Sequence, residues 1–241
     1  MFLDPYFTTQ NDRVVISADQ GSDFAKRVAQ DFNPIHDPDN RRFCVPGDLL
    51  FSLALNTYGL SRTMSVRFAG MVDAETPLIF PKHETGVIDI KDDDGKTYMH
   101  VEHSGETLHD PEILERFTRE YVKFSGQNFP FIMVPLMEEY QVMFNPKRPF
   151  VIYERMAFEL ETIHVPEPTL ELADRTMDIK GRRGDIHFRF NVMSQGKVMG
   201  SGTKTLIVSG LQPYDADVMN GFIDKFYTAK SNFNAKEGIA S

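Results

Sequence analysis

Residues 31–36 read Asp31-Phe32-Asn33-Pro34-Ile35-His36, and this stretch lies between two segments of helical character. It brings a carboxylate, a carboxamide, a turn-forming proline and an imidazole into one short segment. Pro34 disfavours the α conformation for the residue before it, so a preceding helix is expected to end near Asp31 or Phe32. The turn that follows can fold His36 back towards Asp31. This stretch is therefore our candidate site.

The segment before the candidate site has the features of a helix start. Ser17, followed three residues later by Gln20, has the pattern of a capping box. Phe24 and Val28 then provide an apolar face at helical spacing. The pattern predicts a helix over about 19–30.

A second and much more apolar helix is predicted after the candidate site. Pro46 and Gly47 mark its start and Gly59 marks its end. Between them, apolar residues lie on nearly every side: Leu49, Leu50, Phe51, Leu53, Ala54 and Leu55. A helix that is apolar all round is enclosed by other elements rather than lying on a surface.

The sequence downstream of this helix has the composition and alternation of β-strands. Strands are predicted at 65–72, 78–80, 86–91 and 97–103, with a hairpin turn at Asp93-Asp94-Gly95-Lys96. Residues 104–112 are polar and contain Gly and Pro, which predicts a linker. One buried helix with several antiparallel strands predicts a sheet that curls around a helix.

The same order of features recurs after residue 112. A helix is predicted at 113–124 and an apolar one from Val134 to Phe144, followed by strands at 150–165, 169–179, 185–193 and 197–208. Val134-Pro135 corresponds to Val45-Pro46, and Gly196-Lys197 corresponds to Gly95-Lys96. This order predicts an internal duplication, with units at 1–105 and 106–212. Residues 213–241 are predicted to form a C-terminal helix over 214–230 and a frayed tail.

The residue types in the candidate site are suited to the addition of water. A carboxylate near an imidazole, as with Asp31 and His36, can hold a water molecule and take a proton from it. Gly47, at the start of a buried helix, could offer its backbone N–H to a developing oxyanion. Together these groups fit hydration of an α,β-unsaturated thioester, or the reverse dehydration.

The same residues carry a resemblance to a known family. Asp31-Phe32-Asn33-Pro34-Ile35-His36, followed by Val45-Pro46-Gly47, resembles the helix region of MaoC-like (R)-specific enoyl-CoA hydratases over about residues 15–80. The resemblance implies a hot-dog fold, in which Asp31 and His36 activate water and the Gly47 N–H polarises the thioester carbonyl. It also implies that Asn33 steadies the turn. With the duplication, the expected fold is α+β, a tandem double hot-dog.

The chain departs from the pattern of that family at several positions. Pro46 stands where family members usually have histidine, and Asp48 stands where an apolar residue is expected. A carboxylate at position 48 would partly oppose an oxyanion in the site. In the second unit, Gln127, Ile132 and Leu136 replace the Asp, His and Gly, so that unit lacks the groups for the same chemistry.

Three functions follow from the sequence. The first is a hydratase or dehydratase, a lyase of the kind used in fatty acid metabolism, acting on an acyl-CoA or acyl-carrier-protein thioester. The alternatives are a non-catalytic acyl-thioester-binding or scaffold protein, and a hot-dog thioesterase in which Asp31 activates water. Cys44 is interpreted as a small buried residue rather than a nucleophile, while Arg41 and Arg42 could contact a CoA phosphate.

Composition excludes several other classes of function. The formal net charge of −9 argues against non-specific nucleic-acid binding. Cys44 is the single cysteine, which fits a reducing compartment, and no signal peptide or membrane-spanning run is evident. His100 and His103 fall on opposite faces of a predicted strand, so we expect no metal site, and no cofactor is expected either. The expected protein is cytoplasmic, with a homodimer as one possible assembly.

Overall fold

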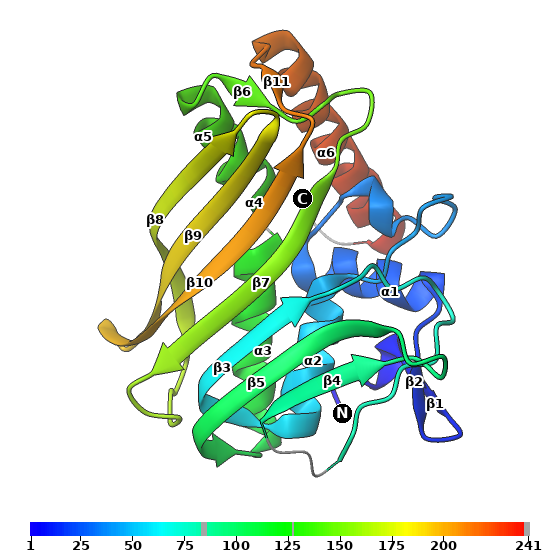
Figure 1. Ribbon diagram of the computed structural model, residues 1–241, viewed down its shortest axis with the longest axis vertical. Helices are drawn as coiled ribbons and strands as arrows, with labels where there is room; N and C mark the ends of the chain where they lie inside the picture. The colour runs from blue at the N-terminus through cyan, green and yellow to red at the C-terminus, as the bar shows by residue number, and fades with distance from the viewer. Residues whose placement is uncertain (83–85, 127, 239–241) are drawn as a thin grey trace.

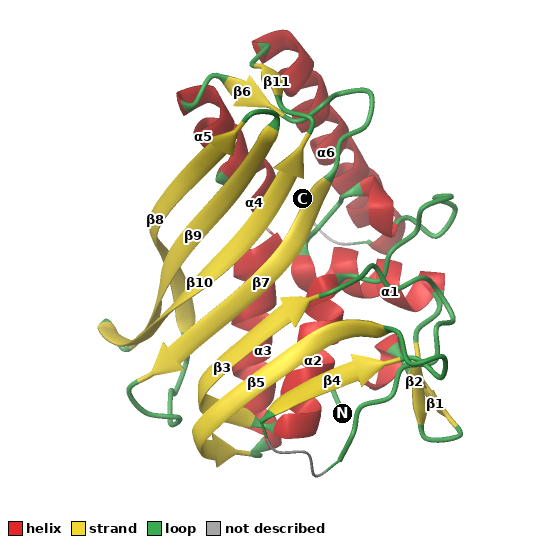
Figure 2. Cartoon of the chain, viewed as in Figure 1, coloured by secondary structure: helices red, strands yellow, loops and turns green. Residues whose placement is uncertain are grey.

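The structure is a computed structural model that describes residues 1–82, 86–126 and 128–238. Its central feature is an antiparallel sheet in the strand order β4-β5-β3-β7-β10-β9-β8 (Figures 1 and 2). The strands are β3 (Leu60–Phe68), β4 (Val87–Lys91), β5 (Thr97–Leu108), β7 (Val151–Leu160), β8 (Thr169–Lys180), β9 (Arg183–Ser194) and β10 (Lys197–Ser209). Two small pairs accompany it: β1 (Thr8–Gln10) with β2 (Arg13–Val15), and β6 (Val142–Met143) with β11 (Gln212–Pro213).

The two halves of the chain, 1–105 and 106–212, meet in the middle of this sheet. β3 pairs with β7 in the register Val66↔Met156, and the sheet continues outward from this seam on both sides. In the first half the order beyond β3 is β5 and then β4. Beyond β4, two isolated bridges continue the pairing, Lys91 with Ile79 and Leu78 with Val14. In the second half the order beyond β7 is β10, β9 and β8.

The helices gather on one face of the sheet, where α2 and α3 lie behind the strands in Figure 1. They are η1 (Asp4–Tyr6), α1 (Ala18–Phe24), the π-helix η2 (Ala25–Ala29), η3 (Pro34–His36), α2 (Gly47–Tyr58), α3 (Pro111–Gly126), α4 (Asn128–Phe131), α5 (Met133–Glu139) and α6 (Ala216–Glu237). The capping box of α1 forms as predicted, with Ser17 and Gln20 each accepting from the other's backbone N–H.

The helix α2 is enclosed, as its apolar sequence predicts. Leu49, Phe51 and Leu55 have no exposed surface. The centre of the Phe51 ring lies 4.6 Å from the centre of the Tyr121 ring of α3. The same core includes Val66 of β3 and residues of β5, β7 and β9. A second core lies under α5 and α6, with Leu136 and Met219 among its fully buried residues. The fold is α+β, a tandem hot-dog in which antiparallel strands curl around a helix in each half.

Several predicted boundaries are wrong. Residues 104–112 are not a linker, because β5 pairs with β3 as far as Leu108 and α3 begins at Pro111. The second apolar helix ends at Glu139 rather than Phe144, since Val142 and Met143 pair with β11. The C-terminal helix continues through 231–237, where only a tail was predicted.

No helix in the described part of the chain is both long and apolar enough to cross a membrane.

Candidate functional site

A distorted helix end sets the direction of the candidate site. The chain changes from α1 to the π-helix η2, and Gln30 then adopts the left-handed conformation with φ of 56°. The Asp31 N–H donates to the Ala25 carbonyl at 2.8 Å and closes this wide turn. Single π-helical turns of this kind recur at functional sites, because they redirect the side chains that follow.

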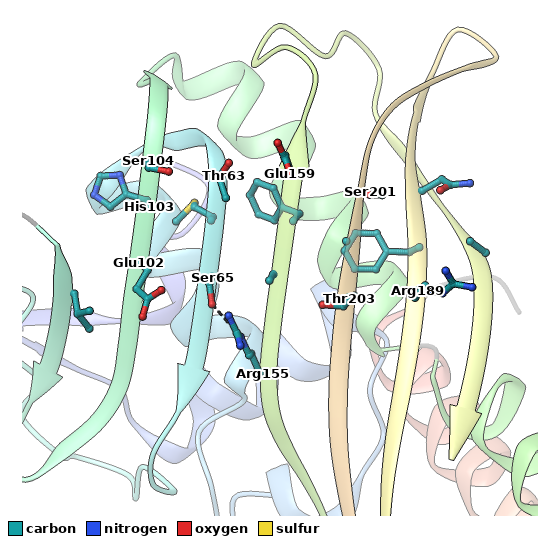
Figure 3. A pocket seen from close by; sticks show the side chains of 18 of the residues that line it. Thr63, Ser65, Glu102, His103, Ser104, Arg155, Glu159, Arg189, Ser201 and Thr203 are labelled. Atoms are coloured by element: carbon teal, nitrogen blue, oxygen red, sulfur yellow. Dashed lines mark hydrogen bonds between the residues drawn. The ribbon is translucent and has the colours of Figure 1, made fainter. Parts of the chain in front are cut away.

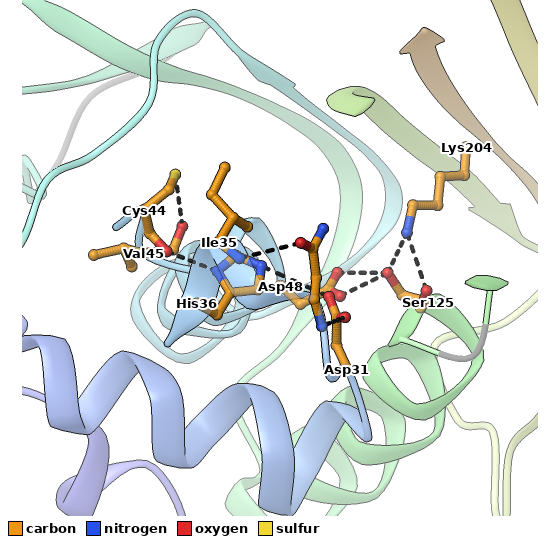
Figure 4. A network of polar contacts seen from close by, with 9 residues as sticks. Asp31, Ile35, His36, Cys44, Val45, Asp48, Ser125 and Lys204 are labelled. Atoms are coloured by element: carbon orange, nitrogen blue, oxygen red, sulfur yellow. Dashed lines mark hydrogen bonds and ion pairs between the residues drawn. The ribbon is translucent and has the colours of Figure 1, made fainter. Parts of the chain in front are cut away.

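Asp31 and His36 come together across the turn (Figure 4). Asp31 Oδ2 lies 3.6 Å from His36 Nε2, while Asp31 Oδ1 accepts from the Asn33 N–H at 2.9 Å. The His36 Nδ1 lies 2.7 Å from the Cys44 carbonyl oxygen. A carbonyl only accepts, so Nδ1 carries a hydrogen and Nε2 faces Asp31. The Asp31 side chain is 30% exposed, so solvent reaches the pair.

Asn33 serves the turn rather than facing the pair. Its side-chain oxygen accepts from the Ile35 N–H at 3.1 Å and caps the short helix η3. The side chain is exposed, so this backbone contact, and not burial, holds it in place. A hydrogen bond of this type favours the turn and leaves Asp31 free to face His36.

Gly47 is the first residue of α2, where helix geometry leaves the backbone N–H without an intrahelical acceptor. A Cβ at this position would lie 3.1 Å from the Tyr153 ring and 3.2 Å from the Phe68 ring. Packing against these two rings therefore favours glycine here.

A buried polar cluster lies beside the pair, and Asp48 is its one member that the sequence pattern singles out. Asp48 of α2 accepts from the Ser125 hydroxyl at the end of α3, with both carboxylate oxygens at 2.7 Å. The ammonium of Lys204, on β10, donates to the same hydroxyl. Burial raises the pKa of Asp48, and the Lys204 ammonium and the Ser125 hydrogen bond act in the opposite direction. Ser125 and Lys204 thus bring the second half of the chain to the site in the first half.

The corresponding turn of the second half has no acid–base pair among its described residues. Gln127 lies outside the described residues. Ile132 uses its carbonyl to accept from Arg175 at 3.3 Å, and Leu136 is buried in the second core.

Other residues singled out from the sequence lie outside the Asp31–His36 pair, each with its own surroundings. Burial raises the pKa of the Cys44 thiol to about 11, while Arg41 and Arg42 are exposed. His100 contacts Asp89 at 2.7 Å, and His103 contacts the Ser61 hydroxyl at 3.0 Å. In the described part of the chain, no three His, Cys, Asp or Glu side chains are grouped as metal ligands would be.

A shallow hollow of about 700 Å³ lies on the face of the sheet that points away from the helices (Figure 3). Polar side chains such as Thr63, Glu102 and Thr203 line it, and Arg155 donates to the Ser65 hydroxyl at 3.1 Å. Lys204 alternates with Thr203 along β10 and points to the opposite face, into the core. The hollow is therefore separate from the Asp31–His36 site.

Comparisons with solved structures give matches at low sequence identity. A conserved protein of unknown function with hot dog fold from Alicyclobacillus acidocaldarius is 10% identical, with 89% of this chain and 99% of that chain covered and a TM-score of 0.45. A MaoC-like dehydratase is 10% identical, with coverages of 83% and 97% and a TM-score of 0.41. An acyl-CoA thioesterase II from Mycobacterium marinum is 9% identical, with coverages of 90% and 99% and a TM-score of 0.40.

The sequence comparisons point to one family. No curated protein sequence matches the chain significantly. One family model matches residues 1–217, a range that spans both halves of the sheet and all of the site residues described above. The chain belongs to the family described as "Protein of unknown function (DUF3581)".

Proposed function

We propose that this protein adds water to, or removes it from, an α,β-unsaturated acyl thioester. The observation that carries this proposal is the 3.6 Å approach of Asp31 Oδ2 to His36 Nε2 beside the first turn of α2. One water molecule can lie at an ordinary hydrogen-bond distance of about 2.8 Å from both atoms, because the two atoms are only 3.6 Å apart. The pair is thus spaced to hold the attacking water.

The contacts around the pair favour distinct roles for its two members. The Cys44 carbonyl fixes the His36 ring through Nδ1–H, so Nε2 can accept one hydrogen of the water and orient it. Asp31 Oδ2 accepts the other hydrogen and acts as the base. The Asn33 N–H holds Asp31 Oδ1, which keeps Oδ2 directed at the water.

The reaction balances with these residues alone. The water oxygen bonds to Cβ as its proton passes to Asp31, and the π electrons of the Cα=Cβ bond move onto the thioester oxygen as an enolate. The Gly47 N–H and the N-terminal end of α2 stabilise that oxyanion. Asp31 then returns the proton to Cα as the enolate collapses, which completes the addition of one water molecule.

The two alternative functions, thioesterase and scaffold protein, would use the same groups. In a thioesterase, Asp31 would direct the water at the carbonyl carbon instead of Cβ, and the carrier thiol would leave. In a scaffold protein the site would bind an acyl-CoA or acyl-carrier-protein thioester without turning it over. All three place the thioester carbonyl at the start of α2.

Activity with crotonyl-CoA tests the choice between these functions. Hydration is followed by the loss of enoyl absorbance, and thiol release is followed in parallel. We expect hydration by the wild type, and a loss of at least about a hundredfold in kcat for Asp31→Asn or His36→Ala, the usual contribution of a general acid or base.

Asp39→Asn, a charge-neutralising change at an exposed position of the same loop, is the matched control and should keep wild-type activity. Hydration that survives both site substitutions contradicts the proposal. Thiol release without hydration identifies a thioesterase, and binding of acyl-CoA without either reaction identifies a scaffold.

A further inference from the structure

The buried polar cluster beside the site consists of Asp48, Tyr121, Ser125, Tyr153 and Lys204. Asp48 belongs to α2 in the first half, and the other four come from α3, β7 and β10 in the second half. Asp48 is 7% exposed and Lys204 is 3% exposed. Figure 4 shows Lys204, Ser125 and Asp48 in line, leading to Asp31.

The contacts of Lys204 favour its charged ammonium form. Its Nζ donates to the Ser125 hydroxyl and lies 3.4 Å from the Ser125 carbonyl oxygen. It also lies 4.1 Å from the centre of the Tyr153 ring, a contact that attracts a cation and not a neutral amine. The hydroxyl of Tyr153 is in turn hydrogen-bonded to that of Tyr121.

The hydrogen bonds run from Lys204 to Ser125 and from Ser125 to Asp48, so Asp48 is the final acceptor. The Ser125 oxygen accepts from Lys204, so its single hydrogen is available to the Asp48 carboxylate. A carboxylate buried without a counter-charge would instead take up a proton. Burial raises the pKa of Asp48 and lowers that of Lys204, and the charge of each residue opposes the shift in the other.

Asp48 also faces the reacting groups. The charged or titratable groups that act on its pKa are Asp31 of the turn, His36 of η3 and Lys204 of β10, and its own charge raises the pKa of the phenols of Tyr121 and Tyr153. Asp48 directly follows Gly47, whose N–H is the proposed oxyanion donor. An uncompensated negative charge on Asp48 would oppose the enolate.

We propose that Lys204 is a positioning residue for the site in the first half: its charge, carried through the bridging Ser125 hydroxyl, balances that of Asp48, so that the first turn of α2 presents no net negative charge to the oxyanion. This inference rests on the proposed hydration. It assigns a function in catalysis to the half of the chain that has lost its own acid–base pair.

The dependence of kcat/KM for hydration on pH tests this role. In Lys204→Met, Asp48 takes up a proton at neutral pH and ionises without a partner at higher pH. We expect activity near that of the wild type at pH 6 and a loss of about tenfold by pH 9, from one unit charge acting over several ångström. Lys197→Met, an exposed lysine on the same strand, should follow the wild-type profile.

The double variant Asp48→Asn/Lys204→Met removes both charges and should restore the alkaline activity. A buried ion pair replaced on both sides is often tolerated, so this variant should also fold. A merely structural role for Lys204 would lower activity equally at all pH values and would not be rescued. Either result, a Lys204→Met profile parallel to the wild type or a double variant as impaired as Lys204→Met, would overturn the proposal.

Carbon-13 NMR of the Asp48 carboxyl group supplies a readout without substrate, assigned by the signal lost in Asp48→Asn. We expect an ionised Asp48 in the wild type at pH 7 and a protonated one in Lys204→Met. A protonated Asp48 in an active wild-type protein would overturn the Lys204 proposal alone. No hydration by the wild type, with the expected NMR signals, would overturn the proposed function and the catalytic role, while the charge balance between Lys204 and Asp48 through Ser125 would stand.

Discussion

The backbone carbonyl and the thiol of Cys44 differ in what they contribute to the candidate site. Its carbonyl oxygen accepts from the His36 ring and fixes which nitrogen faces Asp31. Its thiol is largely enclosed, which raises its pKa to about 11, and the nearby charge of Asp73 acts in the same direction. The backbone of Cys44 therefore bears on the candidate chemistry, whereas its sulfur lacks the thiolate that nucleophilic catalysis requires.

We expect the thiol of Cys44 to react slowly with iodoacetamide at pH 8 in the folded protein. Only about one thiol in a thousand is ionised at that pH when the pKa is about 11. The rate should be at least about a hundredfold below that of the same chain unfolded in urea, measured by mass spectrometry. Cys44→Ser/Asp39→Cys, which moves the thiol to an exposed position of the same loop, is the control and should react readily. Equal rates for the two folded proteins would contradict the prediction.

At the scale of elements, the contact between α3 and η2 holds the candidate turn in place. Gly126, at the end of α3, approaches the backbone of Ala29 so closely that a Cβ would lie 1.8 Å from the Ala29 carbonyl oxygen. Phe32 packs from the other side against Phe226 and Phe233 of α6, with ring centres 5.7 and 5.8 Å away. The turn that carries Asp31 is thus held between two helices that follow it far along the chain.

The close approach of Gly126 predicts that Gly126→Ala destabilises the protein. The added methyl group meets backbone, which cannot rotate away, so we expect a loss of about 3 kcal/mol in the free energy of unfolding. Gly221→Ala, in α6, is the matched control. Nothing lies within 4 Å of its Cβ, so it should be neutral or stabilising by up to about 1 kcal/mol. Urea denaturation measures both, and similar values for the two variants would argue against the close contact.

At the scale of the whole molecule, the two halves share one sheet and one core. The β3–β7 seam makes the sheet continuous, and the main core contains Leu49 and Val66 of the first half together with Phe158 and Phe190 of the second. A single helix, α3, belongs to the second half in sequence but covers α2 of the first.

This shared core predicts that the chain unfolds in one cooperative step. Neither half can lose its structure without exposing apolar surface of the other. Far-ultraviolet circular dichroism and tyrosine fluorescence should give the same urea midpoint. Two separate transitions would show instead that the halves are independent domains.

Local sequence patterns predicted many of the elements correctly. The capping box at Ser17, the enclosed helix from Gly47 and the strands of the second half depend on hydrogen bonds and side-chain periodicity within short segments. Residues 104–108 have the polar side chains of a loop and fall within the predicted linker at 104–112, yet they extend β5 by pairing with β3. Likewise, α6 extends to Glu237, which forms an ion pair with Arg27 at 2.6 Å. Those contacts join residues far apart in the sequence.

The sequence alone places Asp31 and His36 in one tight turn before a buried helix, because six consecutive residues and a proline constrain that geometry. It also contained one signal for the rest of the site: Lys204 alternates with Leu206 and Val208 on an apolar face of a strand. The contacts of that lysine depend on how the chain folds. The partners Asp48 and Ser125 come from two other elements, and only the packing of α2, α3 and β10 removes the water that would otherwise solvate their charges.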